Sequence, residues 1–294
     1  MINPYKFDDY ETVISFSGGR TSGYMLKKIL DAYEKNIPKN IHIIFCNTGK
    51  EMNETLSFVN QCQIEWNVNI VWLEYNSIND EHGFKITNYN EASREGEPFN
   101  LLLKTLRNRR IAAGKTKKDD PFSVLPNPVA RFCTKYLKYD AIRRYMHSID
   151  IKKYDEVLGL RYDEPRRAIR ARNASTRNKS KLTPLFTDKK TKEDILSWWQ
   201  NYKFDLALPV VDGEAPHGNC DLCFLKKKSK VEKLIREDVT RAKWWADQEQ
   251  EFNNVFRKDR PNYTQLIGAI NLNKQGQLFT DANDDEDISC FCHD

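Results

Sequence analysis

The sequence has no run of about 18 apolar residues, which a transmembrane helix would need, and its N-terminal residues lack the basic-then-apolar pattern of a secretion signal. It also has no internal repeats, and only 39% of its residues are hydrophobic. These absences argue against a membrane protein and a repeat protein, and they predict a cytoplasmic chain. Its 294 residues suffice for one large core, or for one domain with a smaller appendage.

Cysteine is sparse, with seven residues in the chain. In a cytoplasmic protein, cysteines more often serve as metal ligands, nucleophiles or core thiols than as disulfides. Cys46 falls in an apolar run and Cys62 in a helical pattern, so we expect both in the core.

The net charge of +5 is modest, but the basic residues concentrate in segments 104–118 and 161–181. Such segments are either solvated surfaces or contacts for a polyanion, which would be a phosphorylated nucleotide or a nucleic acid.

Short apolar runs alternate with amphipathic patterns along the first half of the chain. They predict strands at 12–16, 41–46, 69–75 and 156–160, and helices at 23–34, 53–66 and 134–147. Near-continuous apolar strands between helices favour a parallel sheet covered on both faces, which is an α/β fold. We predict loops at 76–96 and 162–181 and a long helical region at 230–256, and we divide the chain into domains at 1–200 and 201–294.

Residues 13–22 read Val-Ile-Ser-Phe-Ser-Gly-Gly-Arg-Thr-Ser, a strand that meets a glycine turn before a helix. Glycines let backbone N–H groups approach an anion, and a helix N-terminus adds partial positive charge. Ser17, Thr21 and Ser22 add hydroxyl groups. The spacing is not that of the Walker loop. The pattern predicts a phosphate site, although many strand-to-helix turns use Gly and Ser only for their geometry.

Residues 17–22 resemble the pyrophosphate-binding PP-loop of the adenine-nucleotide α-hydrolases, and most closely that of the phosphoadenosine phosphosulfate (PAPS) reductase-like family. Three more stretches resemble family motifs in the family's order: 47–55, 157–164 with Arg167 beyond it, and 183–186. The resemblance implies a HUP/Rossmann-like sheet with a helical, cysteine-bearing C-terminal part. It assigns nucleotide binding to Ser15, Ser17, Gly18, Gly19, Arg20, Thr21, Ser22, Asn47, Thr48, Gly49, Gly159, Arg161 and Arg167.

Two further groups of cysteines have spacings that suggest chemistry. Cys220 and Cys223 form a Cys-x-x-Cys pair, which can hold one metal or act as a redox pair, and Cys133 stands at the start of a predicted helix. In the cluster-bearing sulfonucleotide reductases, helix cysteines join a distant Cys-x-x-Cys around a [4Fe–4S] cluster. The resemblance therefore implies a four-thiolate site of Cys133, Cys220, Cys223 and a tail cysteine, with Cys292 favoured over Cys290. Zinc can use the same ligands, and the four thiols could instead stay apart or reduced.

The chain departs from the family pattern at two acidic positions. Thr21 follows Arg20 where the usual PP-loop has Asp, and Asn47 replaces another Asp, so the motifs specify nucleotide binding better than they specify the reaction. Arg20 would instead place positive charge against phosphate.

We expect an enzyme that binds PAPS, its 3′-dephosphorylated form or ATP and performs sulfur chemistry, with Arg161, Cys290 and Cys292 as catalytic residues. The alternatives are an ATP-dependent sulfur transferase acting on tRNA or DNA, and a non-catalytic nucleotide-binding coactivator. We also expect a protein thiol reductant as a partner, nucleic-acid contact through the two basic segments, and a homo-oligomer.

Overall fold

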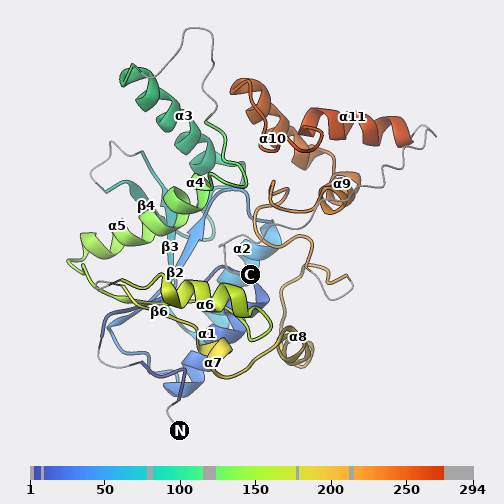
Figure 1. The fold of residues 1–294 in the computed structure, drawn as a ribbon. Coiled ribbons are helices and arrows are strands. Elements are labelled where there is room, and N and C mark those ends of the chain that lie inside the picture. Colours follow the sequence, from blue (N-terminus) through green and yellow to red (C-terminus); the bar gives the residue numbers. More distant parts are fainter. Residues whose placement is uncertain are drawn as a thin grey trace.

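A six-stranded sheet in the order β4-β3-β2-β1-β5-β6 forms the centre of the computed structural model, which describes residues 3–7, 10–77, 82–114, 124–176, 179–211 and 215–274 (Figure 1). The strands are β1 (Thr12–Ser15), β2 (Ile41–Asn47), β3 (Val71–Tyr75), β4 (Phe84–Thr87), β5 (Asp155–Val157) and β6 (Lys181–Leu182). All neighbouring strands pair in parallel except β3 and β4, which are antiparallel. Because β1 lies between β2 and β5, the loops that follow these three strands meet at one edge of the sheet.

Helices cover both faces of this sheet. On one face α1 (Arg20–Ala32), α2 (Asn53–Trp66) and α8 (Lys192–Gln200) pack on Ile14, Phe16 and Phe45. On the other face α5 (Asp140–Ser148) packs on the strand residues that point to that side, such as Val13. The α/β prediction of a doubly covered, HUP/Rossmann-like sheet is therefore confirmed.

The C-terminal part is helical and packs in a second core, which also includes earlier residues such as Tyr75 of β3. This core joins α3 (Glu97–Ala112) to α9 (Lys228–Glu237), α10 (Thr240–Glu251) and α11 (Tyr263–Lys274), which lie together at one end of the sheet in Figure 1. Trp245 is fully buried there, with its ring 5.1 Å from Phe256 and 5.5 Å from Tyr263. Among the described residues, no helix is long and apolar enough to cross a membrane.

The remaining elements correct four sequence-based expectations. The predicted loop 76–96 contains β4, and the predicted loop 162–181 contains α6 (Pro165–Asn173) and ends at the first residue of β6. The predicted helical region 230–256 is two helices, because Asp238 leaves the helical conformation at the end of α9 (φ −152°, ψ 99°) and its Oδ1 accepts hydrogen bonds from Thr240 N and Oγ1. The predicted helix 134–147 is realised as α4 (Phe132–Thr134), a π-helical turn η1 (Lys135–Tyr139) and α5, and α7 (Pro184–Thr187) completes the set. The division into two domains stays a prediction.

Candidate nucleotide site

The loop between β1 and α1 can form only with glycine at position 18. Gly18 has φ +79°, and a Cβ atom there would lie 2.7 Å from Thr55 Cγ2 and 2.9 Å from Val59 Cγ2. The loop thus needs the left-handed conformation and also packs directly on α2. A larger residue at position 18 would collide with side chains of α2, which pack against the loop.

Hydroxyl groups hold the loop closed on itself. Ser22 Oγ donates to Gly19 O at 3.1 Å and accepts from Ser17 Oγ at 2.9 Å and Ser17 N at 3.3 Å. Gly19 is the N-cap of α1, no side chain caps the helix, and its first turn holds no acidic residue. The partial positive charge of the α1 N-terminus is therefore left for an anion.

The loop after β5 brings two predicted arginines to the PP-loop. Arg161 Nη1 donates to Thr21 Oγ1 at 3.3 Å, and Glu164 lies between Arg161 and Arg167 and pairs with both. A Cβ atom on Gly159 would lie 3.4 Å from Ser22 Cα, so this loop packs on the first turn of α1. The structure therefore brings Gly159, Arg161 and Arg167 beside the PP-loop.

A cavity of about 310 Å³ opens at this junction. Its charged lining residues are Arg20, Arg161, Arg167, Lys192, Lys230 and Glu164. Its apolar lining residues, which we call the apolar wall, are Ile195, Leu196, Leu206, Val210 and Ala215. A lining that combines cationic and apolar side chains suits a ligand that joins an anionic group to an apolar ring, as a nucleotide does.

Two residues that the resemblance assigned to the nucleotide have side chains engaged elsewhere. Arg20 hydrogen-bonds to Asp205 and to the carbonyl of Leu208. Ser15 Oγ donates to the fully buried Glu156 at 3.1 Å, and Lys179 Nζ pairs with the same carboxylate at 2.9 Å. Burial is the largest single effect and acts to lower the pKa of Lys179, but the attraction and hydrogen bonds of Glu156 and Tyr154 together outweigh it and the pKa is raised. Ser15 thus belongs to a buried ionic group between β1, β5 and β6.

The turn after β2 is likewise held by buried bonds. Asn47 Nδ2 donates to Glu74 Oε1 at 2.7 Å, and Thr48 Oγ1 donates to Glu51 Oε2 at 2.8 Å. Gly49 has φ +78° and accepts a hydrogen bond from Gly96 N at 2.8 Å. Asn47 and Thr48 are at most 1% exposed. A nucleotide contact by Asn47, Thr48 or Gly49 stays a prediction.

The Cys-x-x-Cys turn packs against this same β2 turn. Asp221 N donates to Lys50 O at 2.7 Å, Lys50 Nζ pairs with Asp221 Oδ2 at 3.0 Å, and both side chains are buried. Thr48 Oγ1 lies 3.5 Å from Cys220 Sγ. Lys226 Nζ donates to the carbonyls of Gly218, Cys220 and Asp221. No sequence signal pairs Lys50 with Asp221, because the two residues are far apart in the chain and each is an ordinary charged residue.

The described cysteines do not by themselves form a closed metal site. Cys220 and Cys223 are buried in the C-terminal core, and Cys133 packs against the same core. Across the described ranges, no three Cys, His, Asp or Glu side chains are arranged to hold a metal ion. Cys290 and Cys292 lie outside the described residues. The four-thiolate site and the catalytic roles of the tail cysteines therefore stay predictions. Cys62 is a core residue as expected, and burial raises the pKa of its thiol.

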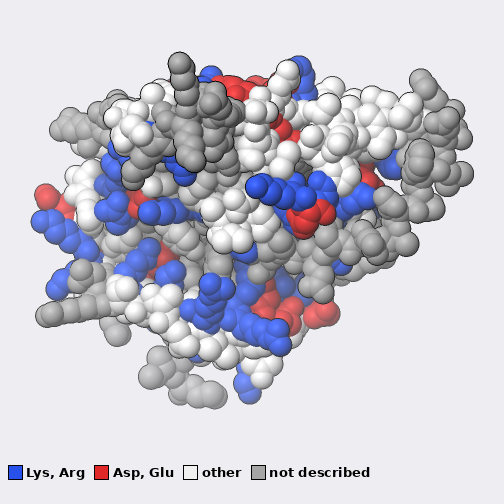
Figure 2. Space-filling view, turned by 45° about the horizontal axis from the view of Figure 1, so that its top comes forward, with Lys and Arg blue, Asp and Glu red and all other residues white. Residues whose placement is uncertain are grey.

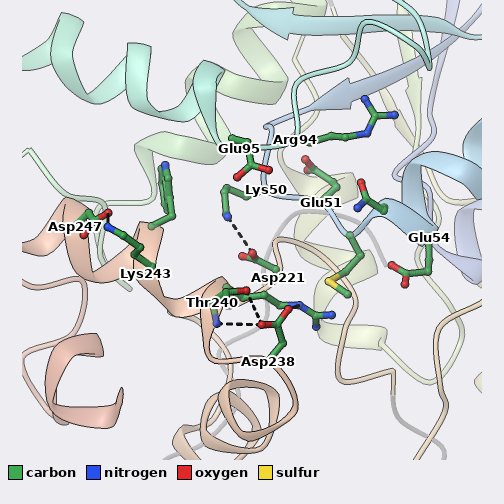
Figure 3. Close-up of a pocket in the computed structure, with 14 residues that line it drawn as sticks. Lys50, Glu51, Glu54, Arg94, Glu95, Asp221, Asp238, Thr240, Lys243 and Asp247 are labelled. Carbon is green, nitrogen blue, oxygen red and sulfur yellow. Dashed lines mark hydrogen bonds and ion pairs between the residues drawn. The ribbon is translucent and has the colours of Figure 1, made fainter. Parts of the chain in front are cut away.

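A second cavity, of about 470 Å³, lies on the other side of the Cys-x-x-Cys turn. Gly218 lines the first cavity and Asp221 the second, so the segment 218–221 borders both cavities. Figure 3 shows the Lys50–Asp221 pair between the β2–α2 turn and α10. The charged lining residues are Lys50, Arg94, Arg241, Lys243, Glu51, Glu54, Glu95, Asp221, Asp238 and Asp247. Acidic groups outnumber basic ones here, so the second cavity suits a polyphosphate less well than the first.

The two basic segments lie on separate helices. Lys104, Arg109 and Arg110 are exposed on α3, and Arg166 and Arg170 are exposed on α6. Figure 2 shows Lys and Arg side chains in several groups on one face, with acidic side chains among them. Parts of both segments lie outside the described residues.

Residues 11–207 match the family model of the phosphoadenosine phosphosulfate reductase domain. The chain belongs to this family. The membership confirms the resemblance of the four motifs and supports nucleotide binding through the PP-loop.

A curated relative of this family member is the uncharacterized nin region protein ORF290 of Escherichia phage lambda, which is 29% identical over 221 residues, 74% of this chain and 67% of the phage protein. A solved structure that also matches is the U34-tRNA thiolase NcsA from Methanococcus maripaludis with its [4Fe-4S] cluster. It is 13% identical with a TM-score of 0.39, over 98% of this chain and 80% of NcsA, and a similarity this low supports no conclusion about function.

Proposed function

We propose that this member of the PAPS reductase family binds an adenine nucleotide in the PP-loop cavity and acts on its phosphate or sulfate group. The observation that carries the proposal is the layout of that cavity. The uncapped N-terminus of α1, Thr21, Arg161 and Arg167 line this cavity together with the residues of the apolar wall. The anionic group of the nucleotide would lie against the α1 N-terminus, Arg161 and Arg167, and its base would lie on the apolar wall.

In this proposal, cysteine thiolates perform the sulfur chemistry. With a sulfonucleotide, the thiolate of Cys290 or Cys292 would attack the sulfur, the nucleoside phosphate would leave, and a protein dithiol would release sulfite from the resulting S-sulfocysteine. Arg161 and Arg167 would hold the anionic oxygens in place during this exchange. A [4Fe–4S] cluster, or zinc, on Cys133, Cys220, Cys223 and a tail cysteine would hold the tail beside the Cys-x-x-Cys turn and tune the electrostatic potential near the site, with a net negative charge once the four thiolates are counted.

Product analysis under anaerobic conditions tests this proposal. The purified protein is incubated with ATP or with a sulfonucleotide, in each case with a dithiol reductant, and pyrophosphate, AMP and sulfite are measured. Sulfite from the sulfonucleotide supports the reductase reaction. Iron, sulfide and zinc analysis of the same sample identifies the metal. Nucleotide binding without any product would contradict an enzymatic role and favour the coactivator alternative.

A second candidate is ATP-dependent sulfur transfer to tRNA or DNA. The exposed Arg166 and Arg170 favour it, because they lie on the same helix as Arg167, which lines the cavity. A nucleic acid bound on α6 would thus lie next to the nucleotide. Its affinity should fall steeply as salt rises, with a log–log slope that reflects the phosphates contacted. Pyrophosphate release that needs added nucleic acid would favour this candidate over the reductase.

A further inference from the structure

Arg20 ties the PP-loop to the segment that carries the apolar wall of the cavity. Arg20 Nε donates to Asp205 Oδ1 at 2.8 Å, and Arg20 Nη2 donates to Asp205 Oδ2 at 2.8 Å and to Leu208 O at 2.8 Å. Arg20 Nη2 also donates to the carbonyl oxygen of Leu206, a residue of the apolar wall. The bidentate geometry matches the planar guanidinium fork to one carboxylate.

The backbone of Arg20 is held as firmly as its side chain. Trp199 Nε1, on α8, donates to Arg20 O at 2.8 Å, and Ile195 and Leu196 of the same helix line the wall. The Arg20 side chain is only 10% exposed. Arg20 thus contacts two of the segments that contribute to the apolar wall, α8 and the segment 205–208.

We propose that Arg20 is a positioning residue that sets ligand specificity. It fixes the apolar wall at a set distance from Thr21, Arg161 and Arg167, so that a ligand must carry a ring as well as an anionic group to fill the cavity. Arg20 pairs with Asp205 in the segment that carries the wall, whereas Arg161 and Arg167 pair with Asp163 and Glu164 of their own loop and Arg161 also reaches Thr21. We therefore assign the phosphate contacts to Arg161 and Arg167. This inference rests on the proposed nucleotide site, and it assigns Arg20 a role other than phosphate binding.

Two probes separate these roles: ATP, which has a ring, and inorganic pyrophosphate, which lacks one. Isothermal titration compares wild type with Arg20→Lys and Asp205→Asn. Lysine keeps the charge but cannot make the bidentate contact, and asparagine removes the partner but keeps Arg20. We expect each variant to lower the affinity for ATP at least about tenfold, as for the loss of a charge-assisted contact. The affinity for pyrophosphate should change by less than about twofold. The control Arg161→Ala should weaken both probes.

The opposite pattern would overturn the inference. If Arg20 is a phosphate ligand, Arg20→Lys and Arg20→Ala will change ATP and pyrophosphate affinity in parallel, while Asp205→Asn will leave both unchanged. Circular dichroism checks that each variant is folded, and Asp205→Glu, which shifts the carboxylate but keeps its charge, replaces Asp205→Asn if that variant does not fold. If wild type binds neither probe, the proposed function fails together with this inference. If wild type binds both probes and the Arg20 variants lose affinity for ATP and pyrophosphate equally, this inference fails but the proposed function stands.

Discussion

Gly18→Ala should destabilise the protein more than any ordinary glycine-to-alanine change. The new Cβ would lie 2.7 Å from Thr55 Cγ2, 2.9 Å from Val59 Cγ2 and 3.3 Å from Phe45 Cε2, at a φ of +79°. A left-handed conformation costs a non-glycine residue about 1–2 kcal/mol. Overpacking a filled core costs about 1–3 kcal/mol more. The free energy of unfolding should therefore fall by about 2–5 kcal/mol.

Gly159→Ala is the matched control, because it lies in the neighbouring loop. Its φ is not in the left-handed region, and its nearest Cβ contact is Ser22 Cα at 3.4 Å, an ordinary distance. We expect it to change the free energy of unfolding by less than about 0.5 kcal/mol. Urea denaturation measures both variants. Equal stabilities would refute the claim that the PP-loop packs directly on α2.

A double variant isolates the steric part of the cost. Thr55→Ser removes the methyl group that a Cβ on residue 18 would meet first. Gly18→Ala combined with Thr55→Ser should be more stable than the sum of the two single changes predicts, whereas the cost of the left-handed φ should remain. Strict additivity would mean that Thr55 is not the limiting contact. ATP affinity, titrated on the same samples, should fall with the displacement of the loop.

Three further predictions follow from the site and the sheet. Arg161→Ala should lower the affinity for ATP at least about tenfold, because it removes a charge-assisted contact. Arg166→Ala, at an exposed residue, should change the affinity for ATP less than about twofold. Equal effects of the two changes in titration would show that Arg161 is only a surface charge. Glu156→Gln should lower the free energy of unfolding in urea by roughly 3 kcal/mol, since it leaves the ammonium of Lys179 without its anionic partner, and an unchanged midpoint would contradict the buried ion pair. Deleting residues 288–294 should lower both metal content and turnover, because the tail is proposed to supply one ligand and one nucleophile; a truncated protein with full metal and full activity would remove the tail from the site.

The sheet and the PP-loop could be predicted because their signals are local. Near-continuous apolar runs mark β1 and β2, and the Ser-Gly-Gly turn between a strand and a helical pattern marks the loop. α6 also carried a local signal, Pro165 at its first position, which its dense arginines obscured. β4 is four residues long and depends on antiparallel pairing with β3, so its own sequence is a weak indicator.

The contacts that shape the site could not be predicted, because their partners are distant in the chain. Arg20 reads as a phosphate-binding cation until Asp205 is found beside it. Lys50 reads as a surface lysine until Asp221 buries it next to the Cys-x-x-Cys turn. Charged residues have no periodic pattern that identifies a partner, so only the fold can show whether such a charge is neutralised or left for a ligand.

Photolabelling with 8-azido-ATP tests the central claim most directly, because it locates the adenine base. The account predicts an ATP-protected label on the apolar wall of the PP-loop cavity, in peptides spanning residues 192–211, and its loss in Arg161→Ala. Label on α10 residues 240–247, which line the second cavity, or label that ATP does not displace, would contradict it.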